Sequence, residues 1–287
     1  MYTFAYHHPQ SIEEAIDIAD SYHHQVRYLA GGTDLLVRIK HVQFQPKAVI
    51  DLKSIGSLSN EIRVSASEIE IGALTLLSSL EQNKAVEKHF PALIEAVSSI
   101  GSVQIRNRAT LGGNICNASP AADSFPALFI YGAKIRIVGK SGGRIVPIED
   151  FVLGPGKTCL SKVEFVDAIL LPIPEYLQSA SFGRLTRRRG VDLATVNLAC
   201  QVRESGSTRF AVGAAAPVPF VVEENGGLLV NANLDQSDKN NLIRKLMQAA
   251  SPITDVRASK EYRKEMLVVL ARRTLEKAVQ KFEKIHR

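Results

Sequence analysis

The spacing of apolar positions predicts short helices and strands in alternation along roughly the first 55 residues. Ser11 and Glu14 have the spacing of a helix capping box, and the apolar residues that follow recur on one helical face. The runs 26–30 and 48–52 are typical of short strands. Between them a glycine pair precedes the apolar-rich stretch 35–39, which predicts a strand, a tight turn and a helix. We expect a small α/β unit here.

The pattern changes after about residue 55. The stretches 62–65 and 69–71 alternate apolar and polar residues, as half-buried antiparallel strands do. Pro91 introduces a predicted helix, and Ser141 lies in a glycine-rich hairpin signal between two further strands. Another strand is expected at 163–171.

The Pro-Ile-Pro sequence at 172–174 marks the expected domain boundary. We therefore expect a first domain at 1–175, with lobes at about 1–55 and 56–175, and a second domain at 176–287.

The predicted second domain opens with strands and finishes with helices. Strands are expected at 194–202 and 210–215, and helices at 239–250 and 261–282. The last helix carries an apolar stripe, which indicates packing against its own domain.

Composition excludes several classes of protein. Of the 287 residues, 45% are hydrophobic and 22% charged, which suits about two folded domains and excludes a mainly disordered chain. No uncharged apolar run approaches the ~18 residues of a membrane span, and the first residues lack the pattern of a secretory signal. The net charge of +6 is scattered and gives no reason to expect nucleic acid as a partner.

The three cysteines, Cys116, Cys159 and Cys200, have no metal-ligand spacing. We therefore expect neither a metal site nor an iron–sulfur cluster held by this chain alone. Reduced thiols are typical of the cytoplasm, which is the expected compartment. Cys116 is expected to be buried as a small hydrophobic residue.

Two glycine-rich segments carry the candidate chemistry. In Ala30-Gly31-Gly32-Thr33-Asp34, a glycine pair at a strand end lets the backbone approach a ligand, and the next amides point at an anion. A glycine pair is also common in plain tight turns, and this one is neither a G-x-G-x-x-G fingerprint nor a P-loop. The second segment, Thr110-Leu111-Gly112-Gly113-Asn114, follows about 80 residues later. Two such loops could clamp a diphosphate, which favours a dinucleotide ligand.

An uncharged stretch separates the second loop from Asp123. The Asp123 carboxylate is suited to accept a hydrogen bond from a ribose hydroxyl. It also has the position of an N-cap for a helix beginning at Ser124, and the two roles are compatible.

These segments resemble a known family. Residues 29–37 and 104–128 resemble the FAD-binding subunits of the molybdenum hydroxylases, which include xanthine dehydrogenase and carbon monoxide dehydrogenase. Further matches at 154–158, 181–199 and 255–263 occur in the family's order and extend the resemblance over nearly the whole chain. The second motif is most similar to the bacterial xanthine dehydrogenase type.

The resemblance implies an α+β fold. A two-lobed FAD-binding domain of the vanillyl-alcohol-oxidase (PCMH) type would precede a compact α/β C-terminal domain, with FAD extended between the two lobes. It implies FAD-binding roles for both loops, for Leu29 directly before the first loop, and for four further positions: Asp123 near the FAD sugar, the backbone of Phe165 or Val166 at the adenine or flavin, and Arg184 beside the flavin ring, where relatives usually carry lysine. The implied cofactor-binding residues are Leu29, Ala30, Gly31, Gly32, Thr33, Asp34, Thr110, Gly112, Gly113, Asn114, Asp123, Phe165, Val166 and Arg184.

The resemblance also implies an electron-transfer function without an acid–base residue on this chain. The substrate would be hydroxylated at a molybdopterin cofactor on a large partner subunit, and electrons would pass through 2Fe–2S clusters on a small partner subunit to the FAD held here. The acceptor would be NAD+ or another oxidant. The run 187–189, three arginines beside the flavin-ring motif, is either a docking edge or a surface for an anionic acceptor.

Two alternatives stay open. The chain could be a free-standing FAD-dependent oxidoreductase, although no motif for its own substrate site is present. It could also be a structural module that has lost the flavin, against which the intact glycines of both loops argue.

Overall fold

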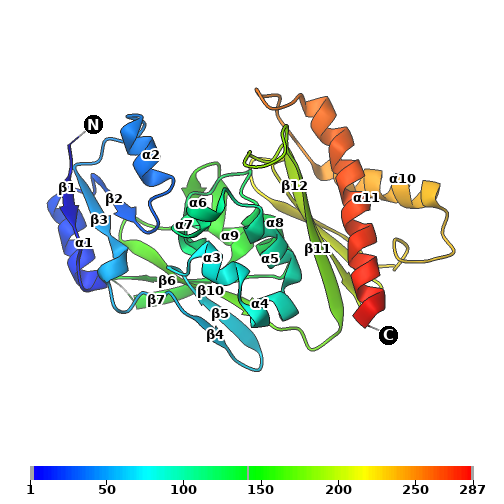
Figure 1. Cartoon of the computed structure of the whole chain (residues 1–287), viewed down its shortest axis with the longest axis horizontal. Coiled ribbons are helices and arrows are strands. Elements are labelled where there is room, and N and C mark those ends of the chain that lie inside the picture. The colour runs from blue at the N-terminus through cyan, green and yellow to red at the C-terminus, as the bar shows by residue number, and fades with distance from the viewer. Residues whose placement is uncertain (1–2, 141, 286–287) are drawn as a thin grey trace.

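The computed structural model describes residues 3–140 and 142–285. Figure 1 shows three sheets in a row, with the N-terminal unit at one end and the long helix α11 at the other. The predicted α+β fold is confirmed, since antiparallel sheets and helices follow a small parallel unit. Ser141, the centre of the expected hairpin signal, lies outside the described residues.

The N-terminal unit is a three-stranded parallel sheet with strand order β1-β3-β2. Ser11 caps α1 by accepting a hydrogen bond from the backbone N–H of Glu14, as the sequence predicts. Helix α2 follows β2 directly, so the glycine pair at 31–32 lies at a strand-to-helix turn. The elements are β1 (Ala5–His7), α1 (Ile12–Ser21), β2 (Val26–Leu29), α2 (Leu35–Lys40), β3 (Ala48–Asp51) and the 3-10 turn η1 (Leu52–Ser54).

The middle part is built on a five-stranded antiparallel sheet with strand order β4-β5-β10-β6-β7. Its helices and strands bury one continuous apolar core around Phe90, Phe125 and Phe151. The strands are β4 (Ile62–Val64), β5 (Glu68–Gly72), β6 (Lys134–Gly139), β7 (Gly142–Pro147), β8 (Val152–Gly154), β9 (Lys157–Thr158) and β10 (Glu164–Pro172). The helices are α3 (Leu77–Glu81), α4 (Lys84–His89), α5 (Pro91–Ser98), α6 (Val103–Arg106), α7 (Leu111–Cys116), α8 (Ser124–Ile130) and α9 (Ile148–Phe151).

The C-terminal part is a four-stranded antiparallel sheet in the order β11-β12-β13-β14. One face packs against α11, as the apolar stripe predicts, and β11 and β13 contact α5 and α8 of the middle part. The elements are β11 (Gln178–Leu185), β12 (Val196–Arg203), β13 (Thr208–Gly213), β14 (Phe220–Glu224), α10 (Gln236–Leu246), η2 (Met247–Ala249) and α11 (Lys260–Ile285). Among the described residues, no helix combines the length and apolar character needed to cross a membrane.

Candidate functional site

A cavity of about 580 Å³ lies between the N-terminal unit and the middle part. Its volume is in the range of small-molecule sites. Both glycine loops and the start of β10 contribute to its wall. The expected cofactor residues that line it are Ala30, Gly31, Gly32, Thr33, Asp34, Thr110, Gly112, Gly113, Asn114, Phe165 and Val166. Among the described residues, Leu29, Asp123 and Arg184 are not part of this wall.

The first loop presents free backbone donors to the cavity. Gly32 has a φ of +75°, a conformation that residues with a Cβ rarely adopt. A Cβ on Gly31 would lie 2.1 Å from the carbonyl oxygen of Arg108, so this glycine is required for the close approach of the two loop regions. In residues 3–140 and 142–285, no acceptor of the chain takes the backbone N–H groups of Gly31, Gly32 and Thr33. These three groups can therefore bind an anionic ligand.

The charged pair of Lys53 and Asp51 supports the first loop through the backbone of Ala30. The Lys53 ammonium donates to the carbonyl oxygen of Ala30 at 3.0 Å and to Asp51 Oδ1 at 2.6 Å. The Tyr6 hydroxyl donates to Asp51 Oδ2 at 2.5 Å. Burial opposes ionisation of Asp51, but the hydrogen bonds from Lys53 and Tyr6 outweigh it and hold the pKa of this carboxyl below its ordinary value.

The second loop uses its backbone donors within the protein. Gly113 N–H donates to the Thr110 hydroxyl oxygen at 3.0 Å, which caps α7. Leu111 N–H and Gly112 N–H donate to the carbonyl oxygens of Thr75 and Ala73 at 3.1 and 3.0 Å. The amides of Leu111, Gly112 and Gly113 are therefore not available to a ligand.

Asn114 is the principal polar side chain of the second loop. Its Oδ1 accepts a hydrogen bond from the Ser124 hydroxyl at 2.5 Å. That bond orients the amide and leaves the NH2 group as a donor on the cavity wall.

An aromatic pair forms part of the third side of the cavity. The rings of Tyr28 and Phe165 meet edge to face, with centroids 4.6 Å apart. Burial, with a smaller effect of Asp20, raises the pKa of Tyr28 to about 12. Its hydroxyl therefore stays protonated and donates to the carbonyl oxygen of Lys162 at 2.9 Å.

Sequence reasoning missed Arg27, Arg38 and Phe44, which also line the cavity. Arg27 lies on β2, the strand that leads into the first loop, at an exposed position. The positive charge of Arg27 on that strand is the feature of the sequence that could have indicated a role in the site. Ile100 also lines the wall.

Asp123 and Arg184 meet each other outside this wall. Asp123 is 6% exposed, and its carboxylate accepts hydrogen bonds from Arg184 and Asn197, both at 2.7 Å, and from Ser99 at 3.2 Å. Burial nonetheless raises the pKa of Asp123. Helix α8 begins at Ser124, but the Asp123 side chain makes no capping hydrogen bond. These contacts connect the middle part to the C-terminal sheet.

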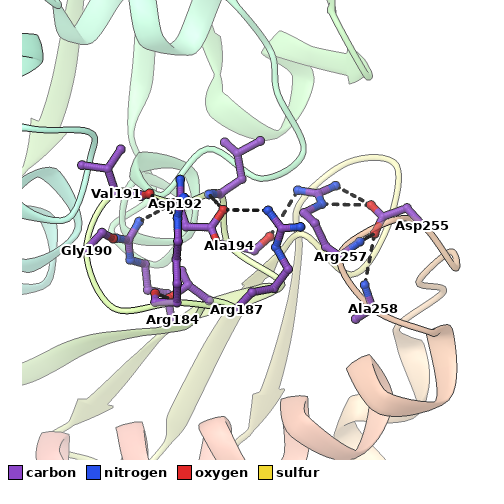
Figure 2. A network of polar contacts seen from close by, with 12 residues as sticks. Arg184, Arg187, Gly190, Val191, Asp192, Ala194, Asp255, Arg257 and Ala258 are labelled. Carbon is purple, nitrogen blue, oxygen red and sulfur yellow. Dashed lines mark hydrogen bonds and ion pairs between the residues drawn. The ribbon is translucent and has the colours of Figure 1, made fainter.

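The arginine run lies on a loop held by its own polar contacts, which Figure 2 shows. Arg187 donates to the Asp192 carboxylate at 3.2 Å, and Arg188 donates to the carbonyl oxygen of Val191 at 3.1 Å. Arg257 forms an ion pair with Asp255 at 2.6 Å. It also donates a hydrogen bond to the carbonyl oxygen of Ala194 at the end of this loop. The loop is therefore a preformed arch.

Cys116 does not pack in the apolar core, contrary to the expectation. Its side chain is open to the cavity, where desolvation raises the pKa of the thiol to about 12. The neighbouring Ile115 is fully buried, so α7 turns its apolar face inward and leaves Cys116 on the cavity side. In the described part of the chain, no group of three or more His, Cys, Asp and Glu side chains could hold a metal ion.

Comparison with known proteins identifies the family. The family model described as "FAD binding domain in molybdopterin dehydrogenase" matches residues 2–174, and "CO dehydrogenase flavoprotein C-terminal domain" matches residues 181–278. The chain is 33% identical over 287 residues to the xanthine dehydrogenase FAD-binding subunit of Escherichia coli O157:H7, covering 97% of each chain. It is 30% identical to the carbon monoxide dehydrogenase medium chain of Afipia carboxidovorans, covering 96% of each.

Solved structures agree with this family. Quinoline 2-oxidoreductase from Pseudomonas putida 86 superimposes with a TM-score of 0.89 at 27% identity, covering 98% of each chain. CO dehydrogenase from Oligotropha carboxidovorans gives a TM-score of 0.88 at 29% identity, covering 97% of this chain and 98% of that one. The chain therefore belongs to the family of FAD-binding subunits found in molybdenum hydroxylases of the xanthine dehydrogenase and CO dehydrogenase type.

Family membership confirms three expectations. The fold is a two-lobed FAD-binding domain of the PCMH type with a compact C-terminal α/β domain. The chain is an oxidoreductase subunit, and its cofactor is FAD. The cavity fits such a cofactor, since free backbone donors, arginines and an aromatic pair all line it.

Proposed function

We propose that this chain is the electron-transfer subunit of a xanthine dehydrogenase-like molybdenum hydroxylase. It takes electrons from 2Fe–2S clusters on a small partner subunit and passes them to an acceptor such as NAD+. A large partner subunit with the molybdopterin cofactor hydroxylates the substrate. The observation that carries the proposal is the cavity between two glycine loops, in which the N–H groups of Gly31, Gly32 and Thr33 are free to bind phosphate oxygens. The 33% identity to a xanthine dehydrogenase subunit supports the choice of enzyme type.

The chain's own residues bind and orient the cofactor in this proposal. FAD, when bound, supplies the redox chemistry, and the protein supplies position and environment. The backbone donors of the first loop hold the pyrophosphate, and the Asn114 NH2 group donates from the opposite side. The apolar wall with Tyr28 and Phe165 excludes water from one side of the cavity.

Asp123 and Arg184 take an indirect role in this proposal. Because they bind each other across the contact between the middle part and the C-terminal sheet, they are positioning residues for that sheet. An arginine, unlike the lysine usual in relatives, can reach the Asp123 carboxylate and the loop carbonyls of Gly190 and Asp192 together. We propose that this contact holds the C-terminal part against the cofactor domain, with the division at 175/176.

The loop that carries the arginine run is the proposed contact for the small subunit or the electron acceptor. Arg187 and Arg188 are engaged within the loop, whereas Arg189 has no ion pair or hydrogen bond among the described residues. Val191 and Leu193 of the same arch are 53% and 60% exposed. Arg189→Ala should slow reduction of the flavin by the partner or its reoxidation by NAD+ while leaving the melting temperature unchanged. Unchanged rates would remove the proposed contact.

Purification of the tagged chain from its native host tests the whole proposal. We expect the chain to co-purify with FAD, with a large molybdopterin subunit and with a small 2Fe–2S subunit, in the cytoplasmic fraction. Mass spectrometry identifies the subunits, and the visible spectrum reports flavin and iron–sulfur absorption. A chain that carries FAD alone and oxidises a substrate without partners would instead be a free-standing flavoenzyme. A colourless chain without partners would contradict both functions.

A further inference from the structure

Two arginines share one aromatic ring at the cavity wall. The Arg27 guanidinium carbon lies 4.6 Å from the centroid of the Phe44 ring, and that of Arg38 lies 5.2 Å from it. Both distances are within the range of cation–π contacts. The Phe44 ring itself packs on the apolar residues Leu29 and Ile39, so the ring is a fixed platform for both cations.

This pair lies at the end of the first glycine loop. Arg27 is on β2, which runs directly into that loop, and Arg38 is one turn along α2. The Arg38 Nε atom lies 3.3 Å from Asp34 Oδ2, at the last residue of the loop. The side chains of Arg27, Asp34 and Arg38 line the same cavity as the free N–H groups of the first loop.

The charges of the wall do not cancel within the chain. Four charged residues line the cavity: Arg27, Asp34, Arg38 and Glu164. Asp34 pairs with Arg38, and Glu164 pairs with Arg144 at 2.8 Å. Arg27 has no carboxylate within ion-pair distance in the described part of the chain, and the only hydrogen bond of its side chain there is to the carbonyl oxygen of Val26. The Arg27 charge is therefore the one on this wall without a carboxylate partner among the described residues, and an anion bound in the cavity would balance it.

We propose that Arg27 and Arg38, held on Phe44, form the cationic half of a diphosphate site whose neutral half is the first glycine loop. The inference rests on the proposed function and adds residues to it. The N–H groups of Gly31, Gly32 and Thr33 supply oriented donors but no charge, whereas the pyrophosphate of a dinucleotide carries two negative charges. Arg27 supplies the charge that nothing else on this wall balances, and its planar fork suits phosphate oxygens.

Binding of ligands with and without phosphate groups tests this site. The full chain is stripped of flavin, and binding of FAD, ADP and riboflavin is measured for the wild type, Arg27→Gln and Arg27→Lys. Arg27→Gln should weaken FAD and ADP by about tenfold, as expected for loss of one charge-assisted contact. Riboflavin, which has no phosphate, should bind within about twofold of the wild type. Arg27→Lys keeps the charge and should retain most of the FAD affinity.

Arg63→Gln is the matched control. Arg63 is on β4, its side chain is 62% exposed, and it lies outside the cavity wall. This variant should bind all three ligands as the wild type does. The inference fails if Arg27→Gln leaves FAD affinity unchanged, or if it weakens riboflavin as much as FAD, which would indicate a purely structural role. A wild-type chain that binds none of the three flavin or nucleotide ligands contradicts the proposed function itself.

Discussion

The two glycine loops have similar sequences, but they differ in where their hydrogen bonds go. At 30–34 the backbone donors are free, and a charged pair, Lys53 and Asp51, holds the carbonyl oxygen of Ala30. At 110–114 the corresponding donors are used up by Thr110, Ala73 and Thr75. The first loop is thus built to bind a ligand, whereas the second is built to present a short helix.

The difference shows that a glycine pair has more than one structural cause. Gly31 and Gly112 are both required by close packing of the chain on itself, because a Cβ would lie 2.1 Å from the Arg108 carbonyl oxygen or 2.6 Å from that of Ala73. Gly32 is required by its positive φ. Space for a ligand is therefore only part of the reason for these glycines.

The largest effect is expected for Gly31→Ala. The added Cβ would push the first loop away from Arg108, so the free energy of unfolding should fall by about 3 kcal/mol, and bound FAD should be lost. Urea unfolding and the flavin content of the purified chain measure both effects. Gly56→Ala is the control, because a Cβ there meets open space. Equal stability of the two variants would contradict the close contact between the loop regions.

Asp51→Asn removes the charged pair that supports the first loop and does not alter the residues whose hydrogen bonds support the second loop. The fold lowers the pKa of Asp51 below its ordinary value of 3.8, so the charged pair stabilises the protein above that pH. The stabilisation is lost as the pH falls through the lower pKa of the folded state. Asp51→Asn should cost about 2 kcal/mol at neutral pH and flatten the loss of stability in acid.

Thermal unfolding as a function of pH measures this change. Asp17→Asn, at an exposed position of α1, is the control and should follow the wild-type curve. An unaltered acid limb in Asp51→Asn would show that the charged pair does not stabilise the loop.

Thr110→Val tests the neutral support of the second loop. Valine keeps the shape of the side chain but removes the cap that accepts from Gly113 N–H, so the free energy of unfolding should fall by about 1 kcal/mol. Thr110→Ser should restore most of it. If serine and valine are equally destabilising, the loss comes from packing and not from the cap.

Thr33→Val is expected to have the smallest effect on stability. In the described residues the Thr33 hydroxyl has no hydrogen-bond partner, so unfolding should change by less than ~0.5 kcal/mol. The affinity for FAD should fall by roughly threefold if this hydroxyl contacts the ligand. Isothermal titration beside Thr110→Val gives the comparison. A loss of stability similar to that of Thr110→Val would remove the distinction between the two loops.

Strong local patterns predicted the fold well where one face of an element is buried. The capping box at Ser11, strands β2 and β3 and the final helix all lie where the pattern places them, whereas strand β1 was not predicted. Strand β11 was missed, because serines occupy two of its buried positions, where the pattern of a strand with two buried faces is apolar. Strand β14 follows two prolines that interrupt the pattern.

The sequence by itself determined the family, the α+β fold and the two loops, because each depends on short motifs in a fixed order. Only the tertiary structure decided which amides of the two loops are free. The amides of Leu111 and Gly112 in the second loop are not free, because they donate to the carbonyl oxygens of Thr75 and Ala73 in a distant segment of the chain. It also brought Asp123 to Arg184 and placed Arg27 and Arg38 on one ring. Local motifs specify backbone conformation, whereas hydrogen-bond partners and unbalanced charges depend on which segments meet in the folded chain.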